Sequence, residues 1–79
     1  MSRENVMAFI NSCKTNDEVY LEVRRLLALG DNNLGFVRLA TEYGYEFTVE
    51  EWMETVMNMY GRPTQELSIA DFDFDQELD

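Results

Sequence analysis

A chain of 79 residues can bury only about 60% of the surface that it exposes when unfolded, so it can build one small core and not two. Apolar residues make up 46% of it, which is enough for a packed core and well above the level of disordered chains. Cys13 is the only cysteine, which excludes an internal disulfide and fits a reducing compartment. The sequence therefore predicts a single small domain.

Two helices are predicted in the first thirty residues. Residues 3–12 form the first helix, because apolar side chains recur at helical spacing and Ser2 can cap its start. Thr15 and Glu18 form a possible capping box for the second helix. Gly30 supplies the left-handed residue that ends this second helix.

A third helix is predicted after Gly30, although Gly35 lowers helix propensity by roughly 1 kcal/mol relative to alanine. Its apolar face contains Leu34, Val37 and Ala40. Gly44 can end it. The residues that can cap its start are Asp31, Asn32 and Asn33.

The fourth helix has the strongest local signals in the chain. Thr48 and Glu51 form a capping box, and Phe47 and Trp52 occupy the two positions of a hydrophobic staple around it. Gly61 stops this helix. The four patterns together predict an all-α fold, a compact bundle of about four short helices over residues 1–62.

An extended acidic C-terminal tail is predicted for residues 63–79. Residues 64–79 contain six acids and no base, and residues 71–75 alternate aspartate and phenylalanine with the period of a strand. In an extended chain both phenylalanine rings point to one side and the aspartates to the other. Two interpretations stay open, a solvated disordered end and a segment that becomes ordered on a partner.

The side chains of catalysis and metal binding are scarce in this sequence. The chain has no histidine, the commonest general base and transition-metal ligand. Cys13 has only Lys14 beside it to favour a thiolate, so a buried structural thiol is the better interpretation. Asp71, Asp73 and Asp75 match the start of a calcium loop, but Gln76 replaces its glycine. We therefore expect no enzyme, no catalytic residue, no metal and no cofactor.

Sixteen acidic and six basic residues give a formal charge of −10. Nucleic acid and an anionic membrane would repel such a molecule, whereas a basic protein surface would attract it. The apolar runs are too short to span a bilayer, and the N-terminus lacks the pattern of a secretory signal. These features predict a cytoplasmic protein whose partner is another protein.

Large apolar groups on the fourth helix and in the tail are the candidate binding residues. The helix carries more of them than one buried face can hide, and methionine adapts readily to a partner. In the tail, two aromatic anchors stand between acids that can meet Lys or Arg. The predicted partner-binding residues are Trp52, Met53, Met57, Met59, Tyr60, Asp71, Phe72, Asp73, Phe74 and Asp75.

Residues 40–51 resemble the Nif-eleven-like nitrogen-fixation small-protein domain family, and residues 2–9 resemble the start of that domain. The resemblance covers about residues 2–60. Its most distinctive part is a turn motif with an alanine, a glycine, two aromatic residues, a threonine and two glutamates. These are Ala40, Gly44, Tyr45, Phe47, Thr48, Glu50 and Glu51.

The resemblance implies a protein-binding function. It points to a nitrogenase-associated accessory factor that docks on the molybdenum-iron component or on an assembly intermediate, and that stabilises, protects or matures it. The alternative is a leader-type domain recognised by peptide-modifying enzymes of ribosomal natural-product biosynthesis. For a leader, the resemblance implies a double-glycine cleavage site at its end. This sequence has no glycine after Gly61, which favours the accessory factor.

Overall fold

The computed structural model describes residues 2–72, and every structural statement below refers to that part of the chain. It contains four α-helices and two short 3₁₀ helices and, within residues 2–72, no strand, so the expected all-α bundle is confirmed. In chain order the elements are α1 (Ser2–Thr15), α2 (Asp17–Leu29), α3 (Leu34–Glu42), α4 (Val49–Tyr60), η1 (Thr64–Glu66) and η2 (Ile69–Phe72).

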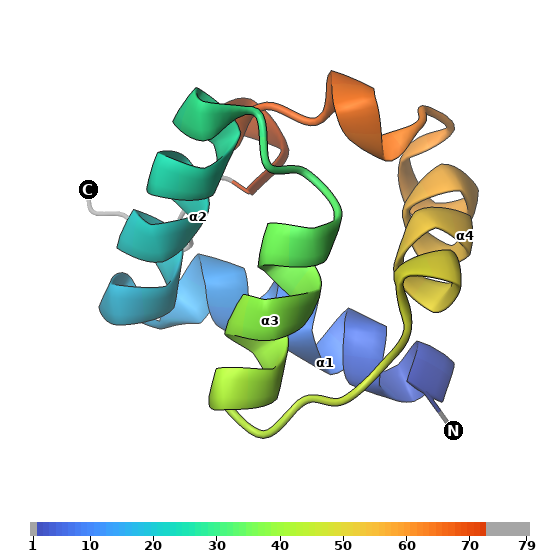
Figure 1. Cartoon of the computed structure of the whole chain (residues 1–79), viewed down its shortest axis with the longest axis horizontal. Helices are drawn as coiled ribbons and strands as arrows, with labels where there is room; N and C mark the ends of the chain where they lie inside the picture. The colour runs from blue at the N-terminus through green and yellow to red at the C-terminus, as the bar shows by residue number, and fades with distance from the viewer. Residues whose placement is uncertain (1, 73–79) are drawn as a thin grey trace.

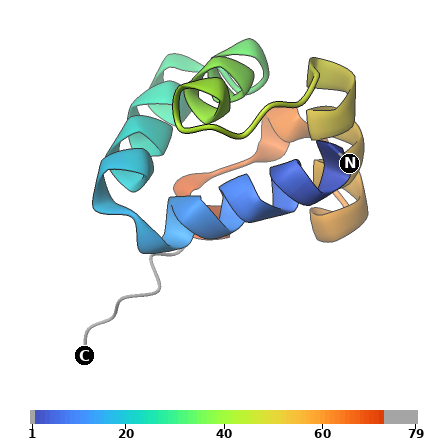
Figure 2. The same ribbon diagram turned by 90° about the horizontal axis from the view of Figure 1, so that it is seen from below.

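The helices surround one core in two layers. Figure 1 shows α2 and α4 on opposite sides of the molecule with α3 in front, and the turned view in Figure 2 places α1 on the face opposite α3. α1 packs against both α2 and α4, and α3 packs against the same two helices. None of these helices is both long and apolar enough to cross a membrane.

Aromatic rings fill the centre of the bundle. The Phe36 ring stacks on the indole of Trp52 with 5.0 Å between centroids, and Phe9 meets Phe36 edge to face at 6.5 Å. Such ring pairs stabilise a core beyond the area that they bury. Around them lie aliphatic side chains and the thiol of α1, which are Val6, Ile10, Cys13, Val19, Val23, Leu26, Leu39 and Val56.

The junction of α1 and α2 corrects one detail of the sequence prediction. α1 runs on to Thr15, whose hydroxyl donates a hydrogen bond back to the carbonyl of Asn11 at 3.1 Å. Asn16 is the cap of α2 instead, and its side-chain oxygen accepts from the backbone N–H groups of Glu18 and Val19. Asparagine caps a helix at least as well as threonine, so the predicted Thr15 capping box is wrong while the helix start is right.

Left-handed glycines end α2 and α3 as predicted. Gly30 has φ 78° and Gly44 has φ 91°. After α3, the N–H of Tyr45 donates to the carbonyl of Ala40 at 2.8 Å, which is the long hydrogen bond of a Schellman motif. This motif turns the chain toward α4, which positions the helix that carries the candidate binding residues.

Both predicted signals at the start of α4 are confirmed. The Thr48 hydroxyl accepts from the N–H of Glu51 at 3.1 Å, and the Glu51 carboxylate accepts from the N–H of Thr48 at 2.9 Å. Phe47 stacks on Trp52 with 6.0 Å between ring centroids. Gly61, with φ 70°, ends the helix, so α4 is fixed at both ends by local interactions.

The described part of the predicted extended tail, residues 64–72, is not extended, and we call it the C-terminal segment. It forms η1 and η2 and crosses back from α4 to pack on α1 and α2 (Figure 2). Leu67 and Phe72 belong to the same core cluster as the four helices. The change of composition after Pro63 therefore does not mark the end of the core, because two apolar side chains beyond it gain more from burial than from exposure.

Candidate protein-docking surface

Trp52 and Phe72 are two predicted binding residues that the structure places inside the protein. Both side chains have 0% exposure. The indole N–H of Trp52 donates to the carbonyl of Asn32 at 2.8 Å, so its polar atom is satisfied internally. We therefore correct the expectation that these rings are exposed: in the folded chain they are core residues.

Phe72 fills a slot lined by rings from α3 and α4. Its ring stacks on Phe36 with 5.8 Å between centroids and meets Tyr60, which is half-buried, at 6.4 Å. Asp71, beside it, forms an ion pair with Arg62 rather than facing solvent. The predicted anchors Asp73, Phe74 and Asp75 lie outside the described residues.

The remaining predicted residues, Met53, Met57 and Met59, are exposed on α4. Their exposed fractions are 40%, 46% and 44%. Met53 and Met57 are one helical turn apart and share one face. Met59 is two residues after Met57, which at 3.6 residues per turn places it on nearly the opposite side of the helix, at the last turn. Only Met53 and Met57 therefore form a continuous apolar strip.

Two glutamates flank that strip, and neither was among the predicted binding residues. Helical spacing places Glu50 and Glu54 on the same face as Met53 and Met57, and all four side chains are exposed. We call these four residues the outer face of α4. The sequence carried a signal for this face: its four residues recur at helical spacing on the side away from Trp52 and Val56, which are buried.

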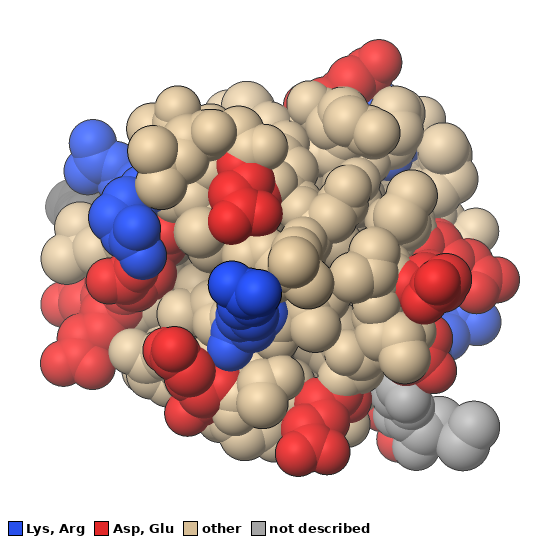
Figure 3. All heavy atoms as spheres, in the orientation of Figure 1, with Lys and Arg blue, Asp and Glu red and all other residues tan. Residues whose placement is uncertain are grey.

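The outer face of α4 is acidic as well as apolar. α4 contains three glutamates and no lysine or arginine. In Figure 3 acidic side chains lie at both sides of the molecule, over α2 and over α4, and the largest group of basic side chains lies over α2. α4 therefore presents exposed methionine side chains beside exposed carboxylates, a combination suited to a positively charged partner.

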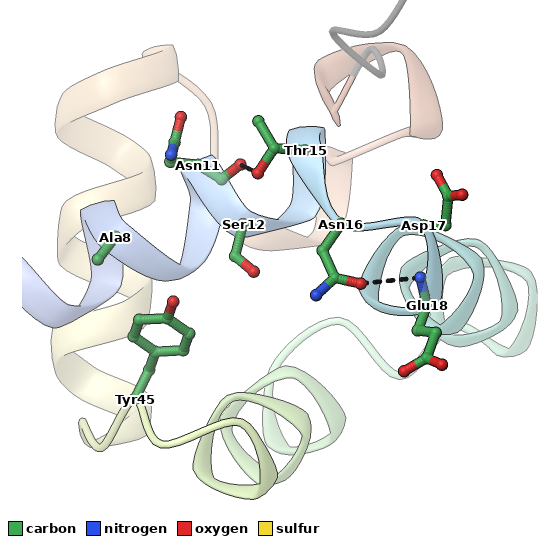
Figure 4. A pocket seen from close by; sticks show the side chains of 8 residues that line it. All are labelled: Ala8, Asn11, Ser12, Thr15, Asn16, Asp17, Glu18 and Tyr45. Carbon is green, nitrogen blue, oxygen red and sulfur yellow. Dashed lines mark hydrogen bonds between the residues drawn. The ribbon is translucent and has the colours of Figure 1, made fainter.

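A second feature is a polar hollow of about 660 Å³ between α1, the start of α2 and the loop after α3. Figure 4 shows Ser12, Asn16 and Tyr45 directed into it, while Asp17 points away. Glu18 at its edge accepts a hydrogen bond from the Tyr43 hydroxyl at 3.5 Å. None of the exposed large apolar side chains of residues 2–72 lines this hollow, whereas Met53 and Met57 lie on the outer face of α4, so we favour that face as the docking surface.

Cys13, the one nucleophile considered from the sequence, is buried in the core. Burial raises the pKa of its thiol from 9.0 to about 12, which outweighs the opposing effects of a backbone hydrogen bond and of Lys14. The thiol is therefore protonated at neutral pH and a poor nucleophile. Within residues 2–72 no group of three or more Cys, Asp or Glu side chains is arranged to hold a metal ion.

Comparison with protein families identifies a match to the first two thirds of the chain. The family model described as the Nif11 domain matches residues 1–52, which include α1 to α3 and the start of α4. No curated protein and no solved structure matches the chain. The matched range ends within the first turn of α4, so most of the outer face of α4 and the C-terminal segment follow it.

Proposed function

Because this chain belongs to the Nif11 domain family, whose model covers about two thirds of it, we propose that it is a non-catalytic accessory protein that acts by binding another protein. The outer face of α4 is the observation that carries this proposal. It combines two exposed methionines with two exposed glutamates on a helix whose ends are both capped. A rigid helix with an exposed apolar strip is a common recognition element.

The non-catalytic part of the proposal is supported by the chemistry of the core. Cys13 is buried with a pKa raised to about 12, and the chain has no histidine. The net charge of −10 disfavours nucleic acid and anionic membranes as partners. We propose that the protein acts in the cytoplasm, on a protein surface with positive charge.

The partner that we propose is nitrogenase, either its molybdenum-iron component or an assembly intermediate of it. This part rests on the resemblance of residues 2–60 to nitrogen-fixation small proteins. Binding would stabilise, protect or mature the partner. The alternative, recognition by peptide-modifying enzymes, rests on the same family and would use the same kind of helical surface.

Co-purification under nitrogen-fixing conditions tests the proposal. The full chain with an N-terminal affinity tag is recovered from cells, and the bound proteins are identified by mass spectrometry. We expect a nitrogenase component or assembly protein to be enriched over an untagged control. The double variant M53Q/M57Q is the second arm, because it keeps the side-chain length and removes the apolar strip.

Three results are informative. Enrichment that is lost in M53Q/M57Q supports both the partner and the surface. Enrichment of a peptide-modifying enzyme in place of nitrogenase would favour the alternative function. Recovery of neither class of protein, with the tagged chain folded and abundant, would contradict the proposed function.

A further inference from the structure

The exposed methionines on α4 form a strip that a single helix can cover. Met53 and Met57 are one turn apart, and the 12 residues of α4 extend over about 18 Å. Methionine is flexible and polarisable, so such a strip adapts to varied apolar side chains. An amphipathic helix of about the same length would bury both methionines along its apolar face.

The flanking acids specify the charge of that helix. Within residues 2–72, neither Glu50 nor Glu54 forms an ion pair or a side-chain hydrogen bond. Their carboxylates therefore face solvent beside the methionines with no basic residue on α4 to neutralise them. Lys or Arg side chains along the edge of an incoming helix would meet both carboxylates, which favours a basic helix over a neutral or acidic one.

The surface is preformed in the free protein. The capping box of Thr48 and Glu51 fixes the first turn, and Gly61 fixes the end. Trp52 and Val56 hold the opposite side of α4 in the core with 0% exposure. A partner would not have to order this helix on binding, which lowers the entropic cost of association.

We propose, building on the protein-binding function above, that the outer face of α4 is a docking site for a basic amphipathic helix in the partner protein. The bound helix places apolar residues one turn apart over Met53 and Met57. Its lysines or arginines lie beside Glu50 and Glu54.

A second copy of this chain fits the same surface poorly. Pairing two outer faces would bring Glu50 and Glu54 of both copies together in one interface, and like charges there are unfavourable. The net charge of −10 per chain adds a long-range repulsion. The C-terminal segment of the chain itself packs on α1 and α2 through η2 and on α4 through η1. Met53 and Met57 remain 40% and 46% exposed with residues 64–72 in place, so these residues do not cover the outer face of α4.

A binding assay with a synthetic peptide tests this inference directly. The probe is a fluorescent 18-residue helix of leucine and lysine in an amphipathic order, and the reference probe has the same composition in a scrambled order. Fluorescence anisotropy is measured with the full chain at several salt concentrations. We expect saturable binding of the amphipathic probe that is at least about tenfold tighter than that of the scrambled probe, a difference set by the apolar contacts.

Two double variants separate the apolar and charged contributions. We expect M53Q/M57Q to weaken binding by about tenfold or more and to leave its salt dependence in place. We expect E50Q/E54Q to flatten the salt dependence, because the two carboxylates no longer attract the lysines. Met7, which is 49% exposed on α1, and Glu46, which is exposed in the loop before α4, provide the matched control M7Q/E46Q, with unchanged binding.

Several outcomes would overturn the inference. Equal affinity for the two probes would mean unspecific charge attraction, and unchanged binding by both α4 variants would place the site elsewhere. Sedimentation of the free chain as a dimer that M53Q/M57Q dissociates would identify a second copy as the occupant. Thermal unfolding of each variant shows that it is folded. Probe binding without nitrogenase in the co-purification would leave this inference standing and contradict the proposed partner.

Discussion

Asp71 makes three polar contacts, and two of them, with Arg62 and Tyr60, connect the C-terminal segment to the rest of the chain. Its carboxylate pairs with Arg62 and accepts from the N–H of Ser68 at 2.9 Å, and its carbonyl accepts from the Tyr60 hydroxyl at 3.2 Å. Partial burial acts to raise the pKa of Asp71, but the hydrogen bonds from Arg62 and Ser68 outweigh it and hold this pKa below its ordinary value of 3.8. Asp71 therefore stabilises the fold in its charged form.

The sign of this pKa shift predicts a pH dependence. Because the pKa is lower in the folded chain, the stabilisation is present above the unfolded value of 3.8 and is lost as the pH falls through the folded value. We expect D71N to lower the urea midpoint at neutral pH, and the gap from the parent chain to narrow below about pH 4. E46Q, at an exposed position, serves as the control. A gap that stays constant down to about pH 2 would contradict this role.

At the scale of the helix, α4 is the element whose ends are fixed most completely by neighbouring residues. Its capping box satisfies the first N–H groups, and its stacked Phe47 and Trp52 rings hold the entry of the chain. These interactions use residues within five positions of one another, so they are local to the start of α4. This local order keeps the outer face of α4 in a fixed conformation.

Removing the Thr48 hydroxyl tests the contribution of this cap. We expect T48A to reduce the free energy of unfolding by about 1 kcal/mol, because an N–H at the start of α4 loses its acceptor. Urea denaturation measures the change. T41A is the matched control, since the Thr41 hydroxyl donates to the Val37 carbonyl inside α3 and caps no helix end. We expect T41A to stay within about 0.5 kcal/mol of the parent, and equal effects of the two variants would refute the capping role.

At the scale of the whole molecule, the C-terminal segment completes the core. Phe72 stacks on Phe36, and Leu67 belongs to the same core cluster. The Asn32 amide donates to the Thr64 carbonyl at 2.8 Å. The loop between α2 and α3 therefore contacts two other parts of the chain. It binds α4 through the indole of Trp52 and the C-terminal segment through Thr64. The bundle of four helices alone leaves one side of this aromatic cluster uncovered.

Truncation tests this conclusion. We expect the chain 1–62 to be much less stable than the chain 1–72, because removal of residues 63–72 exposes Phe36 and Tyr60 and deletes the two buried apolar side chains of Leu67 and Phe72. Thermal unfolding followed by circular dichroism compares the two chains, and their difference depends on residues 63–72 alone. Equal unfolding temperatures would show that the segment is dispensable for the fold.

The full-length variant F72A tests the contribution of the C-terminal segment to stability with a smaller change than the truncation. We expect a loss of about 3–5 kcal/mol in the free energy of unfolding, the range for a large aromatic side chain removed from a core. M57A, which removes an exposed side chain, is the control and should change stability by about 0.5 kcal/mol or less. A small effect of F72A would mean that the slot can collapse around the missing ring.

The sequence by itself determined the elements whose causes are local. Gly30, Gly44 and Gly61 adopt the positive φ angles that end helices, and Thr48 with Glu51 forms the predicted box. These outcomes depend on hydrogen bonds between residues a few positions apart, so their signals are readable along the chain. The choice of Asn16 over Thr15 as a cap was missed because the prediction relied on the Thr15–Glu18 capping-box pattern, although asparagine is at least as good a cap as threonine.

Only the tertiary structure decided which apolar residues face solvent. Met53 and Met57 are exposed as the excess of large side chains on α4 predicted, but Trp52 and Phe72 are buried. Their positions depend on Asn32, which accepts from the indole, and on Phe36, which stacks on both rings. The contact between Asn32 and Trp52 joins residues 20 positions apart, and the ring contacts of Phe36 join residues of different helices. A local pattern of alternating acids and phenylalanines carries no information about such contacts, because burial is a property of the assembled core.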